Sequence, residues 1–252
     1  MNNETLYKVI FERKSIRKYD MTPLPASVIE DLQEFAGHVK TLDDSIKFEC
    51  TYLGANDVKN LLPIKAPHYV CLYSEAKPGY LMNAGFVLQQ LDLYLSSREI
   101  ASCWLGMAKP SRQVMEPKGN MEFIIMLAFG NTAEQIHRSD TSVFTRRSIS
   151  DISEVAGAQE LLEPVRLAPS ASNSQPWYFS GSMQEIIVSR EKPGFLKAPL
   201  YNRLNQIDIG IALCHLWLSI EHQGNTALIT FPDGTPPAGH EFMAKVTIGG
   251  KN

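Results

Sequence analysis

An internal repeat constrains the fold of this chain more than any other feature. Residues 83–95 read NAGFVLQQLDLYL and residues 208–220 read DIGIALCHLWLSI, which aligns Asn83 with Asp208 and Gly85 with Gly210. The leucines that follow also align, and both stretches are apolar on nearly every side. This pattern predicts two buried helices rather than surface helices. The repeat therefore indicates two similar units in tandem.

Short β-rich runs recur around the two helices. FIIMLAFGN at 123–131 and FMAKVTIGG at 242–250 each end in glycine, and HYVCLYS at 68–74 corresponds to QEIIVSR at 184–190. Runs of this kind predict strands. Each half is therefore expected to contain a helix, a strand, a buried helix and a strand.

The repeat divides the chain into two predicted units, residues 1–140 and 141–252. The stretch HRSDTSVFTRRSISDI around 138–152 is polar enough to be the connecting segment. The expected fold class is α+β. Chance similarity between two buried helices is the alternative explanation of the repeat.

Composition excludes several classes of protein. The chain has 252 residues, 44% hydrophobic and 20% charged, with a net charge of −3. These values are typical of soluble globular proteins and argue against a general nucleic-acid binder. No apolar run is long enough to span a membrane, and the N-terminus lacks the apolar core of a signal peptide. We expect a cytoplasmic protein.

No metal, hydrolase or P-loop signature is present in the sequence. Its four cysteines are scattered singly, and its six histidines show no HExxH-like pairing. Buried, reduced thiols and no metal site are expected.

A basic motif lies near the N-terminus, where residues 12–20 read ERKSIRKYD. In an extended segment the alternating Arg13, Ser15 and Arg17 point to one side. Two guanidinium groups beside a hydroxyl could hold a phosphate. A solvated, charged helix end is the alternative. The second half has only RRSISDI at 146–152, where Ser150 replaces the second arginine.

A polar loop is found only in the second half, where residues 167–179 read LAPSASNSQPWYF. Its hydroxyls and amides lie between apolar anchors, Leu167-Ala168 before it and Trp177 to Phe179 after it. A surface loop is one interpretation. Anchored at both ends, however, the loop could hold a fixed array of polar groups for a small ligand.

Together these motifs resemble the FMN-dependent nitroreductase family. The RxSxR stretch, the PSxxNxQPW loop and the buried helices led by Asn or Asp-x-Gly carry the resemblance, which covers most of the chain. It implies a three-layer α-β-α fold, with the two half-units forming an internal pseudo-dimer. One FMN would lie between the units.

The resemblance also assigns residues to the FMN site. Leu105 and Gly106, in ASCWLGM at 101–107, would offer backbone amides to N5 and O4 of the flavin, and Arg146 or Arg147 would reach the phosphate. Ala171 replaces the more common second serine of the loop. The remaining predicted cofactor-binding residues are Arg13, Ser15, Arg17, Pro169, Ser170, Ala171, Asn173 and Gln175.

The implied function is electron transfer from NAD(P)H through FMN to an electron-poor small molecule, such as a nitroaromatic or a quinone, by a ping-pong mechanism. FMN carries this chemistry, so no catalytic side chain is predicted. One FMN per chain, a monomer, and no nucleic-acid or membrane partner are expected. Two alternatives remain: an FMN carrier or sensor without efficient turnover, and an α+β interaction module without flavin.

Overall fold

The computed structural model describes residues 2–114, 118–191, 198–231 and 238–250. Its α-helices are α1 (Asn3–Val9), α2 (Ala26–Ala36), α3 (Tyr80–Ser97), α4 (Ile149–Ile152), α5 (Gln159–Arg166) and α6 (Ala198–His222). Short 3-10 turns lie at Ala55–Asp57, Thr141–Val143 and Ala171–Asn173. The strands are β1 (Phe48–Gly54), β2 (Val58–Asn60), β3 (His68–Glu75), β4 (Ala101–Leu105), β5 (Ala108–Pro110), β6 (Met121–Gly130), β7 (Trp177–Gly181), β8 (Glu185–Glu191), β9 (Asn225–Thr230) and β10 (His240–Gly250).

Two four-stranded sheets repeat one topology. The first has the order β1-β3-β6-β4 and the second β7-β8-β10-β9, with antiparallel pairing throughout. A long buried helix connects two strands of each sheet: α3 runs from β3 to β4, and α6 runs from β8 to β9. The duplication predicted from the two helices is therefore present in the sheets as well. Each unit contributes four strands to its main sheet, where the sequence predicted only two.

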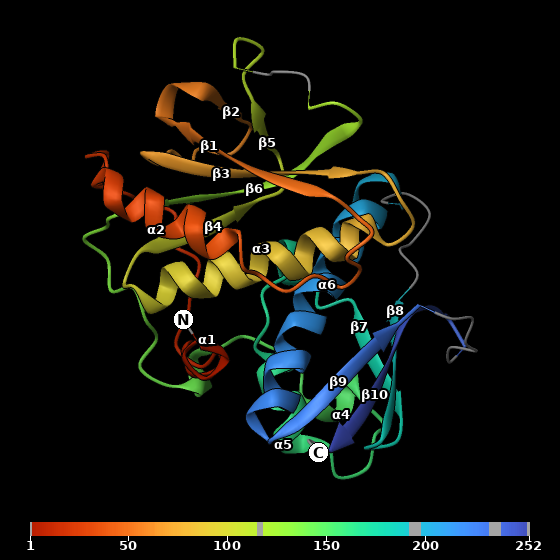
Figure 1. The fold of residues 1–252 in the computed structure, drawn as a ribbon. Helices are drawn as coiled ribbons and strands as arrows, with labels where there is room; N and C mark the ends of the chain where they lie inside the picture. Colours follow the sequence, from red (N-terminus) through yellow and green to blue (C-terminus); the bar gives the residue numbers. More distant parts are fainter. Residues whose placement is uncertain (1, 115–117, 192–197, 232–237, 251–252) are drawn as a thin grey trace.

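The layers are ordered differently from the expected α-β-α arrangement. Helices α3 and α6 lie between the two sheets, with α3 against the first sheet and α6 against the second (Figure 1). The composition of α3 explains this order, because its residues from Leu81 to Ser96 are all buried. A helix that is apolar on every side must be covered by protein on every side.

The outer face of the first sheet has a core of its own. Along β3, Val70 and Leu72 face the helices, whereas Tyr69, Cys71 and Tyr73 face a second, smaller cluster. This alternation follows from the two-residue period of a strand. The small β2–β5 sheet packs over the outer cluster (Figure 1).

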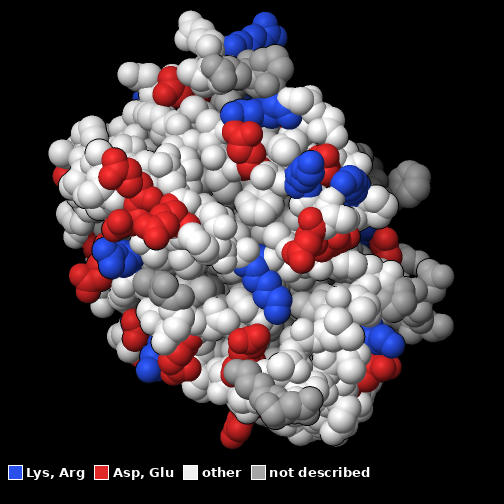
Figure 2. Space-filling view, in the orientation of Figure 1, with Lys and Arg blue, Asp and Glu red and all other residues white. Residues whose placement is uncertain are grey.

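Acidic and basic side chains are interspersed on the face drawn in Figure 2. Within the described ranges, no helix is long and apolar enough to cross a bilayer, and no group of three His, Cys, Asp or Glu side chains could hold a metal ion. The four cysteines are free thiols.

Candidate functional site

Two adjoining cavities lie where the two units meet. The central cavity and the arginine cavity each enclose about 320 Å³, and they share the lining residues Ser15, Arg17, Pro169, Ser170 and Ser172. Because these shared residues come from both the N-terminal motif and the polar loop, the site is complete only when the two units pack together.

The arginine cavity concentrates positive charge. Its described lining contains Arg13, Arg17, Arg138 and Arg146 but no carboxylate. Arginine presents a planar set of donors that matches the oxygens of a phosphate. This cavity is therefore suited to an anion with several oxygen atoms.

Arg13 is held rigidly at the back of this cavity. Arg13 is 1% exposed, and its guanidinium pairs with Asp92 of α3 at an Nε–Oδ2 distance of 2.9 Å and donates to Ser15 Oγ at 2.9 Å. Asp92 also accepts a hydrogen bond from Ser102 Oγ at 2.6 Å. Asp92 neutralises the Arg13 guanidinium from outside the lining, whereas Arg17, Arg138 and Arg146 form no ion pair within the described residues.

Arg138 and Arg146 complete the cavity from the segment that joins the units. The Arg138 guanidinium lies 4.0 Å from the centre of the Phe144 ring and donates to the carbonyl oxygen of Arg13. Burial and the neighbouring Arg13 lower the pKa of both Arg138 and Arg146 to about 10. A bound anion would relieve this repulsion, because it favours the charged form of each group.

The polar loop is fixed in a strained conformation. Ser172, Asn173 and Gln175 have φ angles of 52°, 56° and 48°, in the left-handed region that residues other than glycine seldom adopt. Arg146 Nη1 donates to Asn173 Oδ1 at 2.7 Å, and the backbone amide of Gln175 donates to Ser170 Oγ at 2.9 Å. Strain of this kind persists only where surrounding contacts impose it, and it is concentrated at functional sites.

The central cavity is mostly apolar, with a few polar groups. Its apolar wall consists of Leu62, Ile64, Trp104, Met107, Ile125, Leu204, Ile207 and Ile211. Two of its lining residues have a buried polar atom without a hydrogen-bond partner, Trp104 Nε1 and Asp208 Oδ2. Buried polar atoms normally have partners, so these two are unsatisfied within the protein.

A polar network extends from Arg13 into the helix layer. Gln89 Nε2 lies 3.3 Å from Asp92 Oδ2 and 3.1 Å from His215 Nε2, and His215 Nδ1 lies 2.7 Å from the Pro164 carbonyl oxygen. Burial lowers the pKa of His215 to about 3, so the ring is neutral at pH 7. Its Nδ1–H then donates to Pro164, and its Nε2 accepts from Gln89.

Most of the predicted site residues line these two cavities. They are Arg13, Ser15, Arg17, Gly106, Arg146, Pro169, Ser170, Ala171 and Asn173. Asn173 lies at the arginine cavity, where its Oδ1 and Nδ2 bond to Arg146 and to the Thr145 carbonyl oxygen. Its side chain therefore holds the loop to Arg146.

Three predicted residues are not brought to either cavity. Arg147 bonds instead to Glu191 Oε1 at 2.6 Å and to the Asp151 carbonyl oxygen. Gln175 is 4% exposed and fixes the loop by accepting from the Arg147 amide and donating to the Asn173 carbonyl oxygen. Leu105 packs into the outer core of the first sheet.

Sequence reasoning missed Arg138, Ser172 and the role of Asp208, all of which line the site. Arg138 lies eight residues before Arg146 in the same polar segment, so the basic character of this segment was the available signal. Asp208 was visible only as the polar first residue of a buried helix. Nothing in the sequence separates Ser172 from its serine neighbours.

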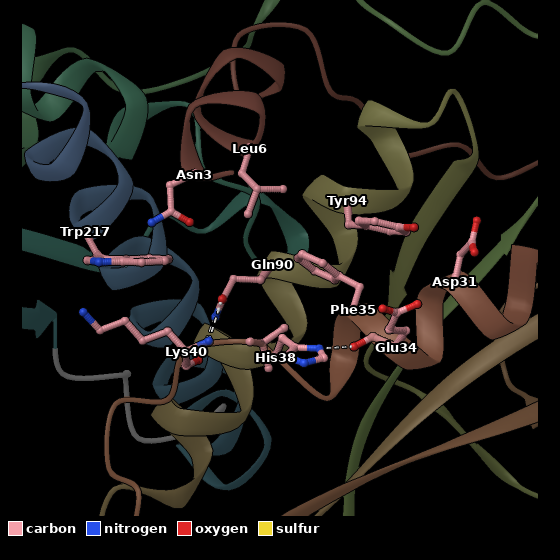
Figure 3. A pocket seen from close by; sticks show the side chains of 11 residues that line it. Asn3, Leu6, Asp31, Glu34, Phe35, His38, Lys40, Gln90, Tyr94 and Trp217 are labelled. Carbon is pink, nitrogen blue, oxygen red and sulfur yellow. Dashed lines mark hydrogen bonds between the residues drawn. The ribbon is translucent and has the colours of Figure 1, made fainter. Parts of the chain in front are cut away.

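A larger groove of about 660 Å³ lies elsewhere, among α1, α2, α3 and α6 (Figure 3). Phe35 stacks on Tyr94 at 4.3 Å between ring centres, and Lys40 Nζ lies 5.0 Å from the centre of the Trp217 ring. Gln90 is bonded to the Lys40 backbone. No residue of the RxSxR stretch or of the polar loop lines this groove, and the charged side chains of the groove are exposed. It is not the site indicated by the motifs.

A protein-family model described as Putative TM nitroreductase matches residues 5–220. The chain shares the fold of a putative nitroreductase from Thermotoga maritima, with 21% identity, a TM-score of 0.64, and coverage of 98% of this chain and 95% of that chain. No curated protein matches the chain.

Two further solved structures match part of the chain. A nitroreductase family protein from Clostridium difficile is 18% identical over 60% of this chain and 96% of its own, with a TM-score of 0.47. A nitroreductase with bound FMN from Desulfitobacterium hafniense is 17% identical over 59% of this chain and 100% of its own, with a TM-score of 0.41.

Proposed function

The chain belongs to the Putative TM nitroreductase family, and on that premise we propose that it is an FMN-dependent oxidoreductase. It passes electrons from NAD(P)H to an electron-poor small molecule of the nitroaromatic or quinone type. The observation that carries this proposal is the four-arginine cavity that opens into an apolar cavity between the units.

The chemistry of the two cavities fits FMN. The arginine cavity offers guanidinium groups to a phosphate, and Ser15 and Arg17 lie where the two cavities adjoin. The central cavity offers aliphatic and aromatic walls to a planar ring. The unpartnered Asp208 Oδ2 and Trp104 Nε1 could serve the polar atoms of that ring. Sites for such cofactors typically combine apolar walls with a few placed polar groups.

Bound FMN would supply the acceptance and donation of hydride. The protein residues bind it, orient it and exclude water. Ile207 and Ile211 of α6, with Ile125 of β6, form an apolar wall. Gly106 follows β4 and lines the central cavity, whereas Leu105 does not. The backbone of Gly106 is therefore better placed than that of Leu105 to offer a hydrogen bond. NAD(P)H and the acceptor would use the same open space in turn, which gives ping-pong kinetics.

We propose one FMN per chain and a monomeric protein, with the units at 1–140 and 141–252. In the first unit, the loop equivalent to the polar loop contains Leu42. The Leu42 amide donates to Asn83 Oδ1, just as the Ala171 amide donates to Asp208 Oδ1. That loop carries Asp43 and Asp44, which would repel a phosphate.

The basic segment RRSISDI at 146–152 contributes to this one FMN site and not to a second, equivalent site between the units. Arg146 lines the arginine cavity, while Ser150 Oγ lies 2.9 Å from Ser148 Oγ. A second, equivalent site would therefore lack both the arginine cluster and the polar loop.

The test is anaerobic reduction of the protein reconstituted with FMN. NADH or NADPH should bleach the flavin absorbance, and a quinone or a nitroaromatic should restore it. Bleaching without reoxidation would favour the carrier or sensor alternative. A protein that stays colourless and gains no thermal stability from added FMN would contradict the proposal, because a ligand that binds the folded state stabilises it.

A further inference from the structure

Asp208 is an acidic residue that neither motif includes. It lies on α6, lines the central cavity and is 3% exposed. Its Oδ1 accepts a hydrogen bond from the Ala171 amide at 3.0 Å, whereas its Oδ2 is buried without a hydrogen-bond partner. One oxygen therefore anchors the polar loop, and the other has no hydrogen-bond partner in the protein.

Anchoring the loop does not require an acid. In the first unit, Asn83 occupies the corresponding position on α3 and accepts from the Leu42 amide at 2.8 Å in the same way. A neutral amide therefore does in one unit what the carboxyl group does in the other. The acid at Asp208 needs a second explanation, and its position on the central cavity supplies one.

The surroundings of Asp208 disfavour an ionised carboxylate. Within the described part of the chain Asp208 forms no ion pair, and the titratable or charged groups that line its cavity are Arg17, Cys103 and Tyr201. Burial raises the pKa of Asp208 to about 8. The Ala171 amide and the Ser174 hydroxyl partly oppose this, although the Ser174 hydroxyl is not placed to hydrogen-bond Oδ2. An uncompensated buried charge is strongly unfavourable, so the group takes up a proton instead.

We propose that Asp208 carries a proton on Oδ2 at neutral pH and donates it in a hydrogen bond to a carbonyl oxygen or ring nitrogen of the molecule bound in the central cavity. The inference rests on the proposed function, because it takes the ring of FMN as that molecule. Asp208 then determines specificity, since it favours a planar heterocycle with an acceptor at this edge over one with a donor there.

Asp208→Asn is the matched variant, because Asn83 shows that an amide fits this position. The amide keeps an acceptor for Ala171 and presents a neutral donor in place of the acid. The dissociation constant for FMN should be measured from pH 6 to pH 9 for the parent and the variant. Thermal denaturation at each pH checks that both remain folded.

The two proteins should respond differently to pH. Parent affinity should fall by up to about tenfold for each pH unit above the pKa of Asp208, because binding requires the proton. Asp208→Asn should bind within about threefold of the parent at pH 6 and should lack this decline. Equal pH dependence in both proteins, or a loss of more than about tenfold in the variant at pH 6, would overturn the inference.

A second measurement does not depend on FMN. The carboxyl carbon of Asp208, labelled with ¹³C and assigned by its absence in Asp208→Asn, should titrate near pH 8 in the FMN-free protein. Titration near pH 4 would overturn the inference even if FMN binds. A parent that takes up no FMN while this carbon titrates near pH 8 would instead overturn the proposed function, and with it the assignment of the ligand.

Discussion

Gly85 and Gly210 face each other where α3 crosses α6. A Cβ added at Gly85 would lie 2.1 Å from the Ile207 carbonyl oxygen and 3.2 Å from the Gly210 Cα. A Cβ at Gly210 would lie 2.0 Å from the Met82 carbonyl oxygen. The contact is therefore reciprocal, and it lets the two helix backbones approach more closely than any side chain would allow. It joins the two units through their repeated helices.

Alanine at either glycine should force the helices apart. Overpacking of this kind costs about 1–3 kcal/mol, which in a chain of this size lowers the melting temperature by about 2–4 °C for each kcal/mol. Gly250→Ala is the control, because nothing lies within 4 Å of the added Cβ. Thermal denaturation of the three variants tests this. Unchanged melting temperatures in Gly85→Ala and Gly210→Ala would show that the helices can separate freely.

The arginines of the site should separate into binding and structural roles. Arg17 lines both cavities, is exposed, and forms no hydrogen bond or ion pair within the described ranges. Arg17→Ala should weaken FMN binding by about 1.5–3 kcal/mol, or at least about tenfold, without changing the melting temperature. Arg112, exposed and outside both linings, provides the matched Arg→Ala control.

Arg13→Ala should behave differently, because it leaves Asp92 buried without its partner. Breaking a buried ion pair in this way typically costs about 3–5 kcal/mol of stability. Urea denaturation of the FMN-free proteins should show this loss for Arg13→Ala and none for Arg17→Ala. Equal stability of these two variants would contradict the structural role of the Arg13–Asp92 pair.

His215 should make the protein sensitive to acid. Its pKa is lowered from 6.5 to about 3 by burial, so between these values the unfolded chain binds a proton that the folded chain does not. Stability therefore falls as pH decreases through this window. From pH 6.5 to pH 5 this residue alone accounts for about 2 kcal/mol.

His215→Gln removes the titrating group, and His38→Gln, at an exposed histidine, is the control. The measurement is the free energy of unfolding of the parent and of both variants at pH 6.5 and at pH 5. The His215 variant should lose about 2 kcal/mol less than the parent over this interval. An identical loss in both would mean that His215 is protonated in the folded protein.

Asp208 should have the opposite effect on the pH dependence of stability. Its pKa is raised from 3.8 to about 8, so the folded chain holds a proton that the unfolded chain has released. Stability contributed by this proton is complete below about pH 4 and decreases as pH rises to about 8. Asp208→Asn should therefore gain stability relative to the parent between pH 5 and pH 9 in chemical denaturation. A constant difference would argue for an ionised carboxylate.

The sequence predicted the centre of the fold better than its surroundings. The alignment of Gly85 with Gly210 located both buried helices, because a helix without a polar face has few other places to lie. Strands β1, β4, β7 and β9 of the two main sheets were missed; ASCWL of β4 and NTALIT of β9, for example, are short and carry little alternation. The order of the layers was also wrong, because the pattern of one helix does not tell which element covers it.

The site, too, could be predicted only in part from the sequence. Arg13, Ser15 and Arg17 were predicted together because two-residue spacing alone places them on one side of an extended segment. Arg146 and Arg147 could not be separated, since only tertiary contacts turn Arg147 toward Glu191. Arg138 and Asp208 reach the cavities through the packing of distant segments, which no local pattern encodes.

One FMN is proposed to bind between two unequal units of a single chain. Titration of the FMN-free protein with FMN, with the molecular mass measured by light scattering on the same sample, gives the stoichiometry that decides this. We predict one FMN per chain on a particle with the mass of one chain, and a binding step that Arg17→Ala weakens about tenfold or more. Two FMN per chain, or no saturable binding, would rule out a single site between the units.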